Sequence, residues 1–578
     1  MKAQVLRENA RRVLAREVGF VQKPHANRLR IALCFPNTYF VGMSNLGFQT
    51  IYRLFNAHED VVCERVFLPP KQELASQLQA STKLISLESQ TPISDFDVFA
   101  FSISFEWDYT NVVSMLRLAG LPIYATERSP GHPLVLIGGA VTFVNPEPLA
   151  PFADVIAAGE GEALIQNFIE AMSAATSRQG LLTSLAEKRG FYIPSFYEPR
   201  YAPDGTLAAL EPRAPAPAVV RKAAVKTTEH LDPPHTTLFT PDTEFGSRFL
   251  IEVVRGCANL CRFCWAGYNY LPVRAFPTER ILDLARKAKR YSNRTGLVSI
   301  ALCDHPDIEH ILSNLSEMGY SISPASLRLD DLTPTIVGLL QSSGERTLTI
   351  APETGSDRLR RVINKTVTNE EILDRSELIF ASGIQNLKLY FMIGLPTETD
   401  EDLQSIRDLT LQIRERMMRY GKARGHVGRI IGSVNPLIPK PGTAYQWLPM
   451  EDIALTDRKV KHLRRLMSDV DNVYFTIKSE RHSYYQALLS LGDRRVAPAI
   501  VAAERNGGNW RAAVAETNVD ADFFIFRDRR ADALLPWDII DGGMKQTFFR
   551  SEFEKALKAE WTLPPKRARE NEHLIPVL

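Results

Sequence analysis

Cysteine is scarce in this chain, with 6 among 578 residues. A small secreted fold held together by disulfides is therefore excluded, and each cysteine that does occur needs its own explanation. Charge of one sign is also missing, because 69 Lys and Arg face 67 Asp and Glu and leave a net charge of +2. Composition thus gives no strong signal for nucleic acid or an anionic membrane surface.

Long hydrophobic runs are absent as well. No stretch reaches the ~18 apolar residues that a membrane helix needs. Residues 1–29 are rich in arginine, but Glu8 and Glu17 interrupt them and they lack the apolar core of an export signal. We expect an amphipathic N-terminal helix there and a protein of the cytoplasm. An organellar transit peptide fits less well, because such peptides are poor in acidic residues.

A chain of 578 residues is long enough for two to four domains. The segment 30–190 alternates short apolar strands with helices, which predicts a doubly wound parallel sheet of the Rossmann type. Ligands of such α/β folds bind beyond the carboxyl ends of the strands. Residues 191–246 are rich in proline and predict a linker that lies partly on the domain surfaces.

The segment 247–450 has its own pattern of strands and helices. Six strand-like runs occur in it, at 249–254, 298–302, 325–329, 347–351, 386–393 and 430–434. Six βα units predict a partial (βα)6 barrel, with active residues at the carboxyl ends of its strands by analogy with the full barrel. Residues 451–578 change to a mainly helical pattern, and we predict a C-terminal helical and mixed domain there.

Three of the six cysteines stand together. Cys257, Cys261 and Cys264 form a CxxxCxxC pattern directly after the first of these strand-like runs. Three close thiolates without a fourth can bind three corners of a 4Fe-4S cluster and leave one iron open to a substrate. A structural zinc site normally has four ligands, so zinc is a weaker interpretation. Inert buried cysteines are the other alternative, although three within eight residues are unusual.

This cysteine pattern resembles that of the radical S-adenosylmethionine (SAM) superfamily. Phe263, just before the last cysteine, matches the aromatic residue usually found there. The resemblance implies that the open iron chelates SAM, and that an electron from the cluster cleaves SAM to methionine and a 5′-deoxyadenosyl radical. It also implies a reductant such as ferredoxin or flavodoxin as a partner.

The same resemblance suggests residues that would bind SAM. The stretch from 351 to 365 is similar to the E-x-G-S-x-x-L-R region of the superfamily, so Glu353 would meet the SAM ribose or amino group and Gly355 would allow close backbone approach. Ser326 and Arg328 are similar to a serine and an arginine that contact SAM in relatives. Gly394 would lie beside the adenine.

Each of these assignments has a plainer alternative. The stretch after Glu353 also fits a strand-to-helix turn capped by Ser356. Arg328 also fits an ion pair with Asp330 or Asp331. At two further strand ends, Cys303 is either a thiol of the site or a buried apolar residue, and residues 436–443 are either a loop near the substrate or a proline-rich turn.

The first domain resembles the cobalamin-binding domain that precedes many radical SAM cores. The resemblance rests on Gly138 and Gly139, on Asp154 and on the Gly159-Glu-Gly-Glu162 stretch. It implies that the two adjacent glycines approach cobalamin and that Ser102 bonds to its nucleotide tail. None of the eleven histidines lies in the Asp-x-His-x-x-Gly motif that ligates cobalt in other cobalamin proteins. The alternative is a Rossmann-like domain that has lost its cofactor.

Three functions follow from these patterns. The first is a radical SAM enzyme that modifies an unactivated carbon of an unidentified substrate, with cobalamin-dependent methyl transfer as one form of it. The second is a cobalamin-independent radical SAM enzyme that rearranges its substrate or inserts sulfur. The third is an iron-sulfur electron carrier or redox sensor, which would normally have a fourth cysteine.

Overall fold

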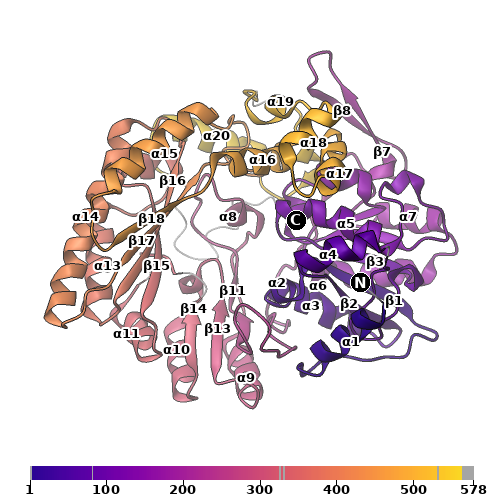
Figure 1. Ribbon diagram of the computed structural model, residues 1–578, viewed down its shortest axis with the longest axis horizontal. Coiled ribbons are helices and arrows are strands. Elements are labelled where there is room, and N and C mark those ends of the chain that lie inside the picture. The colour runs from indigo at the N-terminus through magenta and orange to yellow at the C-terminus, as the bar shows by residue number, and fades with distance from the viewer. Residues whose placement is uncertain (1–2, 81, 325–326, 330–331, 530–532, 563–578) are drawn as a thin grey trace.

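The computed structural model describes residues 3–80, 82–324, 327–329, 332–529 and 533–562. It contains two parallel-sheet units that lie side by side (Figure 1). The N-terminal unit is coloured indigo to purple in the figure, and the second unit is pink to orange. Helices near the C-terminus, in yellow, lie across the top of both units. None of the described helices is long and apolar enough to cross a membrane.

The N-terminal sheet has the strand order β2-β1-β3-β4-β5-β6. The first five of these strands are parallel, and β6 runs antiparallel to β5. The strands are β1 (Leu29–Thr38), β2 (Val61–Leu68), β3 (Val98–Ser102), β4 (Leu134–Gly138), β5 (Val155–Ala157) and β6 (Phe191–Tyr192). This arrangement confirms the predicted doubly wound sheet.

Strand order reverses at β1, which has β2 on one side and β3 on the other. Right-handed crossovers that leave in opposite directions put their helices on opposite faces of the sheet. Accordingly, α3 (Leu46–Asn56) contacts α6 (Gly161–Ala174), while α5 (Tyr109–Ala119) contacts α17 (Ala497–Arg505) of the C-terminal region. The reversal leaves a crevice at the carboxyl ends of the strands, where ligands of such sheets bind.

The second unit consists of two parallel sheets, β10-β13-β14 and β15-β16-β17-β18. Their strands are β10 (Phe249–Glu252), β13 (Arg294–Val298), β14 (Ser321–Pro324), β15 (Thr347–Glu353), β16 (Asn386–Ile393), β17 (Ile430–Pro436) and β18 (Val473–Ile477). The partial βα barrel is thus confirmed as a fold class. Its helices include α11 (Pro334–Ser342), α12 (Asp357–Ile363), α13 (Asn369–Ala381) and α14 (Asp400–Ala423).

Two of the predicted strands were wrong in their bounds, and one strand was not predicted. The second and third strands lie about four residues earlier than the runs at 298–302 and 325–329. The apolar run after Val298 does not continue the ladder, because residues 298–300 line a cavity at the strand end. In addition, β18 extends the sheet with residues that we had assigned to the helical C-terminal domain.

The proline-rich segment 191–246 forms the hairpin β7 (Tyr197–Tyr201) and β8 (Leu207–Pro212). It continues into β9 (Val220–Arg221), which pairs with β19 (Ile540–Asp541) from near the C-terminus. The C-terminal region is otherwise mainly helical, with α15 (Ile453–Met467), α16 (Glu480–Leu491), α18 (Trp510–Thr517) and α20 (Gln546–Leu557). Segments far apart in the sequence therefore pair with each other in the linker and the C-terminal region.

Candidate functional site

The cysteine loop lies between β11 (Val254–Arg255) and α8 (Trp265–Asn269). Cys257 and Cys261 are buried, and Cys264 is half-buried. The structure thus places all three predicted cysteines in one sheltered loop at the end of the first barrel strand. Among the described residues, no three His, Cys, Asp or Glu side chains converge as ligands of a single metal ion. Thiols that each bind a different iron of a cube do not need to converge.

Burial and nearby charges set the protonation of these thiols. Burial raises the pKa of Cys257 to about 11, against an opposing effect of Arg328. It raises the pKa of Cys261 to about 12, against an opposing effect of Lys365. Burial also raises the pKa of Cys264, where Lys365 again opposes it. Two cations therefore lie near the thiols and would stabilise negative charge on them.

A buried ion pair holds the cysteine loop against the C-terminal region. Arg262 is fully buried, and its Nε lies 3.1 Å from Oε2 of Glu552 in α20. The same guanidinium donates hydrogen bonds to the carbonyl oxygens of Arg361 and Val362, at distances of 2.7 and 3.1 Å. On the other side of the loop, Asn364 donates to the carbonyl of Leu260. Sequence reasoning missed Arg262, because its partner lies 290 residues away.

Glu353 ends β15, and Lys365 faces it across α12. The Nζ of Lys365 lies 3.4 Å from Oε1 of Glu353. Burial raises the pKa of Glu353, and Lys365 partly offsets the effect. The backbone of Glu353 is left-handed, with φ of 64°. A non-glycine residue in that conformation is strained, and such strain is common at functional sites.

Arg328 lies near Cys257, and Asp304 is its partner among the described residues. Its guanidinium forms an ion pair of 2.9 Å with Asp304, and Asp304 accepts a hydrogen bond of 3.0 Å from the backbone N–H of Ala258. The Arg328–Asp304 pair thus reaches into the cysteine loop. Ser326, Asp330 and Asp331 lie outside the described residues. Cys303 is half-buried in the short helix that also contains Asp304.

The two glycines assigned to SAM are explained by contacts inside the protein. A Cβ on Gly355 would lie 2.1 Å from the carbonyl carbon of Ser405 in α14. The lack of a side chain at Gly355 therefore allows α14 to pack closely against this turn. Gly394 has a φ of 75° and donates its N–H to Oε2 of Glu398 over 2.8 Å. Glu398 is in turn paired with Lys459 at 2.7 Å.

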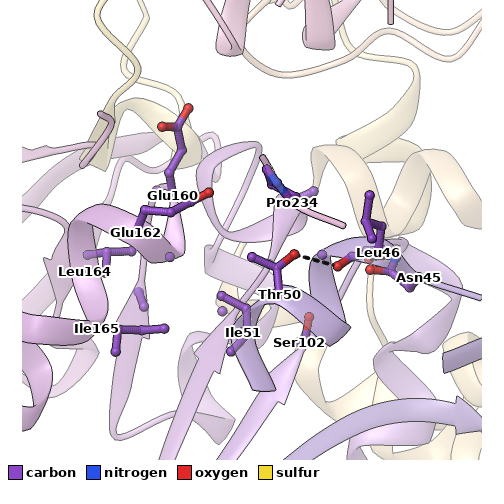
Figure 2. A pocket seen from close by; sticks show the side chains of 18 of the residues that line it. Asn45, Leu46, Thr50, Ile51, Ser102, Glu160, Glu162, Leu164, Ile165 and Pro234 are labelled. Carbon is purple, nitrogen blue, oxygen red and sulfur yellow. Dashed lines mark hydrogen bonds between the residues drawn. The ribbon is translucent and has the colours of Figure 1, made fainter. Parts of the chain in front are cut away.

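A cavity of about 480 Å³ opens at the carboxyl ends of the N-terminal strands (Figure 2). Ser102, Gly138 and Gly139 all line it, so the structure brings the three residues predicted for cobalamin to one place. Its inner wall is apolar and comes mainly from α3, α6 and β6. The apolar residues there are Ile51, Phe55, Leu164, Ile165, Phe168 and Phe191.

The two adjacent glycines that were predicted to approach cobalamin differ in their surroundings. Gly139 has a φ of 100°, and a Cβ there would lie 2.3 Å from the carbonyl oxygen of Ile103, so the turn itself requires glycine. A Cβ on Gly138 would meet nothing closer than 3.6 Å. Of these two, Gly138 is therefore the one at which a side chain could be added without a clash.

Charged residues from both sheet units meet at the rim of the cavity. Glu160 and Glu162 come from the N-terminal unit, and Arg255 and Arg274 come from the second unit. Arg274 pairs with Glu160 at 2.7 Å, and Arg255 pairs with Glu162 at 2.9 Å. Arg255 stands two residues before Cys257, so this network connects the rim to the cysteine loop. Among the described lining residues there is no His, Cys or Met.

Two protein-family models match this chain. Residues 251–410 match the model of the radical SAM superfamily. Residues 47–194 match the model described as the N-terminal region of radical SAM proteins. The first match contains the cysteine loop, Arg328, Glu353 and Gly394, and the second contains most of the N-terminal sheet and its cavity.

Known proteins with similar sequences include an uncharacterised protein of Methanocaldococcus jannaschii. It is 25% identical over 472 residues, which cover 81% of this chain and 89% of that protein. The tRNA-2-methylthio-N(6)-dimethylallyladenosine synthase of Bdellovibrio bacteriovorus is 22% identical over 198 residues, covering 32% of this chain and 43% of that enzyme. Among solved structures, the radical SAM methyltransferase TsrM of Kitasatospora setae, with cobalamin and a 4Fe-4S cluster bound, is 12% identical with a TM-score of 0.45. That match covers 86% of this chain and 99% of TsrM.

Proposed function

Because the chain is an enzyme of the radical SAM superfamily, we propose that Cys257, Cys261 and Cys264 hold a 4Fe-4S cluster whose open iron binds SAM. When bound and reduced, the cluster supplies the electron that cleaves SAM and produces a radical able to take hydrogen from an unactivated carbon. The observation that carries the proposal is the sheltered loop of three thiols with cations beside it. A reductant such as ferredoxin or flavodoxin would supply the electron in the cytoplasm.

We assign the neighbouring side chains to SAM by their charge. Arg328 offers a planar guanidinium to the SAM carboxylate, and Asp304 keeps that guanidinium oriented toward the cysteine loop. Glu353 offers a carboxylate to the SAM amino group. Its 3.4 Å separation from Lys365 is longer than a strong charge-assisted hydrogen bond, so Glu353 retains capacity for a second partner. The burial of the loop excludes water from these contacts.

We further infer that the 480 Å³ cavity takes part of a cobalamin molecule. Its apolar wall suits a nucleotide base, and its rim offers polar groups such as Ser102, Asn45 and Glu160. The bare face of Gly138 would let a flat ring approach the strand end. The described lining residues would hold the cofactor by apolar contact along the wall and by hydrogen bonds from the polar rim. Methyl transfer to carbon is the reaction that this pair of cofactors would support.

Anaerobic reconstitution tests the cluster and the cleavage of SAM. Wild-type protein with iron, sulfide, dithionite and SAM should form 5′-deoxyadenosine, and Cys261→Ala should not. Equal behaviour of the two proteins would remove the radical SAM assignment and favour an electron carrier or sensor.

Cobalamin binding is tested separately by desalting after incubation with hydroxocobalamin. Wild type should retain it, and Gly138→Leu, which fills the cavity from an unstrained position, should not. Retention by neither protein, together with normal formation of 5′-deoxyadenosine, would favour the cobalamin-independent rearranging or sulfur-inserting enzyme.

A further inference from the structure

A second, smaller cavity of about 110 Å³ lies where the two sheet units and the C-terminal helices meet. It is large enough for several water molecules or one small polar group. Its lining comes from the segment between β3 and α5, the first residue of α5, the loop after β4, α8, the loop after β17, and α16. The lining includes Phe105, Glu106, Trp265, Lys440, Gln486 and Ser490.

This cavity borders both proposed cofactor sites. Trp265 follows Cys264 directly in the chain, and Ser104 lines this cavity and also the 480 Å³ cavity. The ring of Phe143, which lines the larger cavity, lies 5.8 Å from the ring of Trp265. A molecule seated here would therefore lie next to the cysteine loop and next to the cavity of the N-terminal sheet.

The centre of the small cavity is charged. Lys440, from the loop after β17, forms an ion pair with Glu106 and donates a hydrogen bond of 2.9 Å to the hydroxyl of Ser490. Ser490 in turn donates to Glu106 over 2.9 Å. Burial alone would raise the pKa of Glu106, but Lys440 and the hydrogen bonds outweigh it and lower the pKa. Glu106 is thus ionised and already neutralised by Lys440.

Positive charge and hydrogen-bond donors are in excess around this pair. Lys478 lies close enough to Lys440 that burial, and then Lys440, lower its pKa. The Nζ of Lys478 donates to Oε1 of Gln486 over a distance of 3.1 Å, which fixes the orientation of the amide and leaves its NH₂ group as a donor. An ammonium has three hydrogens, and two of those on Lys440 are used by Glu106 and Ser490. The remaining donors can serve an acceptor in the cavity, and two lysines beside the single carboxylate of Glu106 favour an anionic one.

We propose that this cavity binds a carboxylate group of the substrate, with Lys440 as its anchor and Gln486 as a second donor. The assignment rests on the proposed radical SAM function, because it concerns the substrate of that reaction. The rings of Phe105 and Trp265 would contact the carbon atoms next to the carboxylate. The remainder of the substrate would extend past Trp265 toward the cysteine loop, where its reacting carbon belongs.

A purely structural role for Lys440, Glu106 and Ser490 predicts different behaviour. If these residues only join the domains, removal of either charge should weaken the fold and have no selective effect on ligands. If the cavity binds a carboxylate, Glu106 competes with that carboxylate for Lys440. Glu106→Gln should then leave carboxylate binding unchanged or make it tighter, whereas Lys440→Met should weaken it.

The experiment uses the reconstituted full chain and ligand-observed NMR. The probes are a panel of aliphatic, aromatic and α-amino carboxylates, each paired with its neutral primary amide. At least one carboxylate should bind wild type at least tenfold more tightly than its amide, and Lys440→Met should remove that preference. Lys461→Met, which changes an exposed lysine with a side chain 67% accessible, is the matched control and should keep it.

Because Lys440→Met leaves Glu106 buried and unpaired, the double variant Lys440→Met with Glu106→Gln provides a folded comparison, and it too should show no preference. Equal binding of every carboxylate and its amide by wild type, or weaker carboxylate binding by Glu106→Gln, would overturn the assignment. The production of 5′-deoxyadenosine by the same samples is measured in parallel. If wild type forms no 5′-deoxyadenosine, the radical SAM function is refuted, whether or not carboxylates bind.

Discussion

The ammonium of Lys365 lies 3.4 Å from the carboxylate of Glu353. It also lies close enough to the three cysteines of the loop that its positive charge favours their thiolate forms. The pair is buried but too long for a strong charge-assisted hydrogen bond, which is normally about 2.7–2.9 Å. Each member of the pair can therefore interact with a second group of opposite charge. For Glu353 that partner is the proposed amino group of SAM, and for Lys365 it is the negative charge of thiolates and cluster.

Replacement of Lys365 should make the cluster harder to reduce. Reduction adds negative charge, and a nearby cation stabilises the reduced form. A unit charge about 7 Å from the cluster, at an effective dielectric constant of about 20, contributes about 2.4 kcal/mol. Its loss should therefore lower the midpoint potential by on the order of 100 mV. A redox titration followed by EPR would show the shift in Lys365→Met. Lys365→Arg keeps the charge and should stay near the wild-type potential; an equal shift in both variants would contradict an electrostatic role.

Breaking the Arg262–Glu552 pair should destabilise the cysteine loop. Both side chains are fully buried, and removal of one partner from such a pair costs about 3–5 kcal/mol. Glu552→Gln should therefore lower the unfolding temperature and the iron content after reconstitution. The double variant Arg262→Met with Glu552→Met leaves no unpaired charge and should recover part of the lost stability. If Glu552→Gln holds iron and unfolds like wild type, α20 does not support the loop.

Two glycines offer a matched test of packing against ligand binding. Gly355→Ala would place a Cβ 2.1 Å from backbone of Ser405 and should cost about 3 kcal/mol or more. Gly338 lies inside α11 with open space around its Cα, so Gly338→Ala should stabilise the helix by about 0.5–1 kcal/mol. Thermal unfolding of the two variants without SAM measures both effects. An unchanged stability of Gly355→Ala would return this glycine to a role in approaching SAM.

Residues that share one loop, or that lie at the ends of neighbouring parallel strands, were predictable from the sequence. The three cysteines fall in one loop after a strand, and Ser102, Gly138 and Gly139 line one cavity because the carboxyl ends of parallel strands share one edge. The loop 436–443 was one candidate for a position near the substrate, but the partners of Lys440, of Lys365 and of the Arg262–Glu552 pair were not predicted, since they come from distant segments. Strand bounds were missed for a similar reason: the apolar residues after Val298 line a cavity instead of continuing the strand.

The carboxyl group of Glu398 should make stability depend on pH. Burial raises its pKa to about 7, against the opposing effect of Lys459, whereas an unfolded glutamate titrates near 4.3. Between about pH 4.3 and 7 the folded state therefore binds more protons than the unfolded state, so this group's contribution falls as pH rises. The change should amount to about 4 kcal/mol across that window and then level off. Denaturant unfolding of wild type and Glu398→Gln at several pH values isolates it, because glutamine does not titrate. The difference in free energy of unfolding, variant minus wild type, should grow from pH 5 to 7. A constant difference would contradict the prediction, because it would mean that Glu398 is ionised throughout and forms an ordinary salt bridge with Lys459.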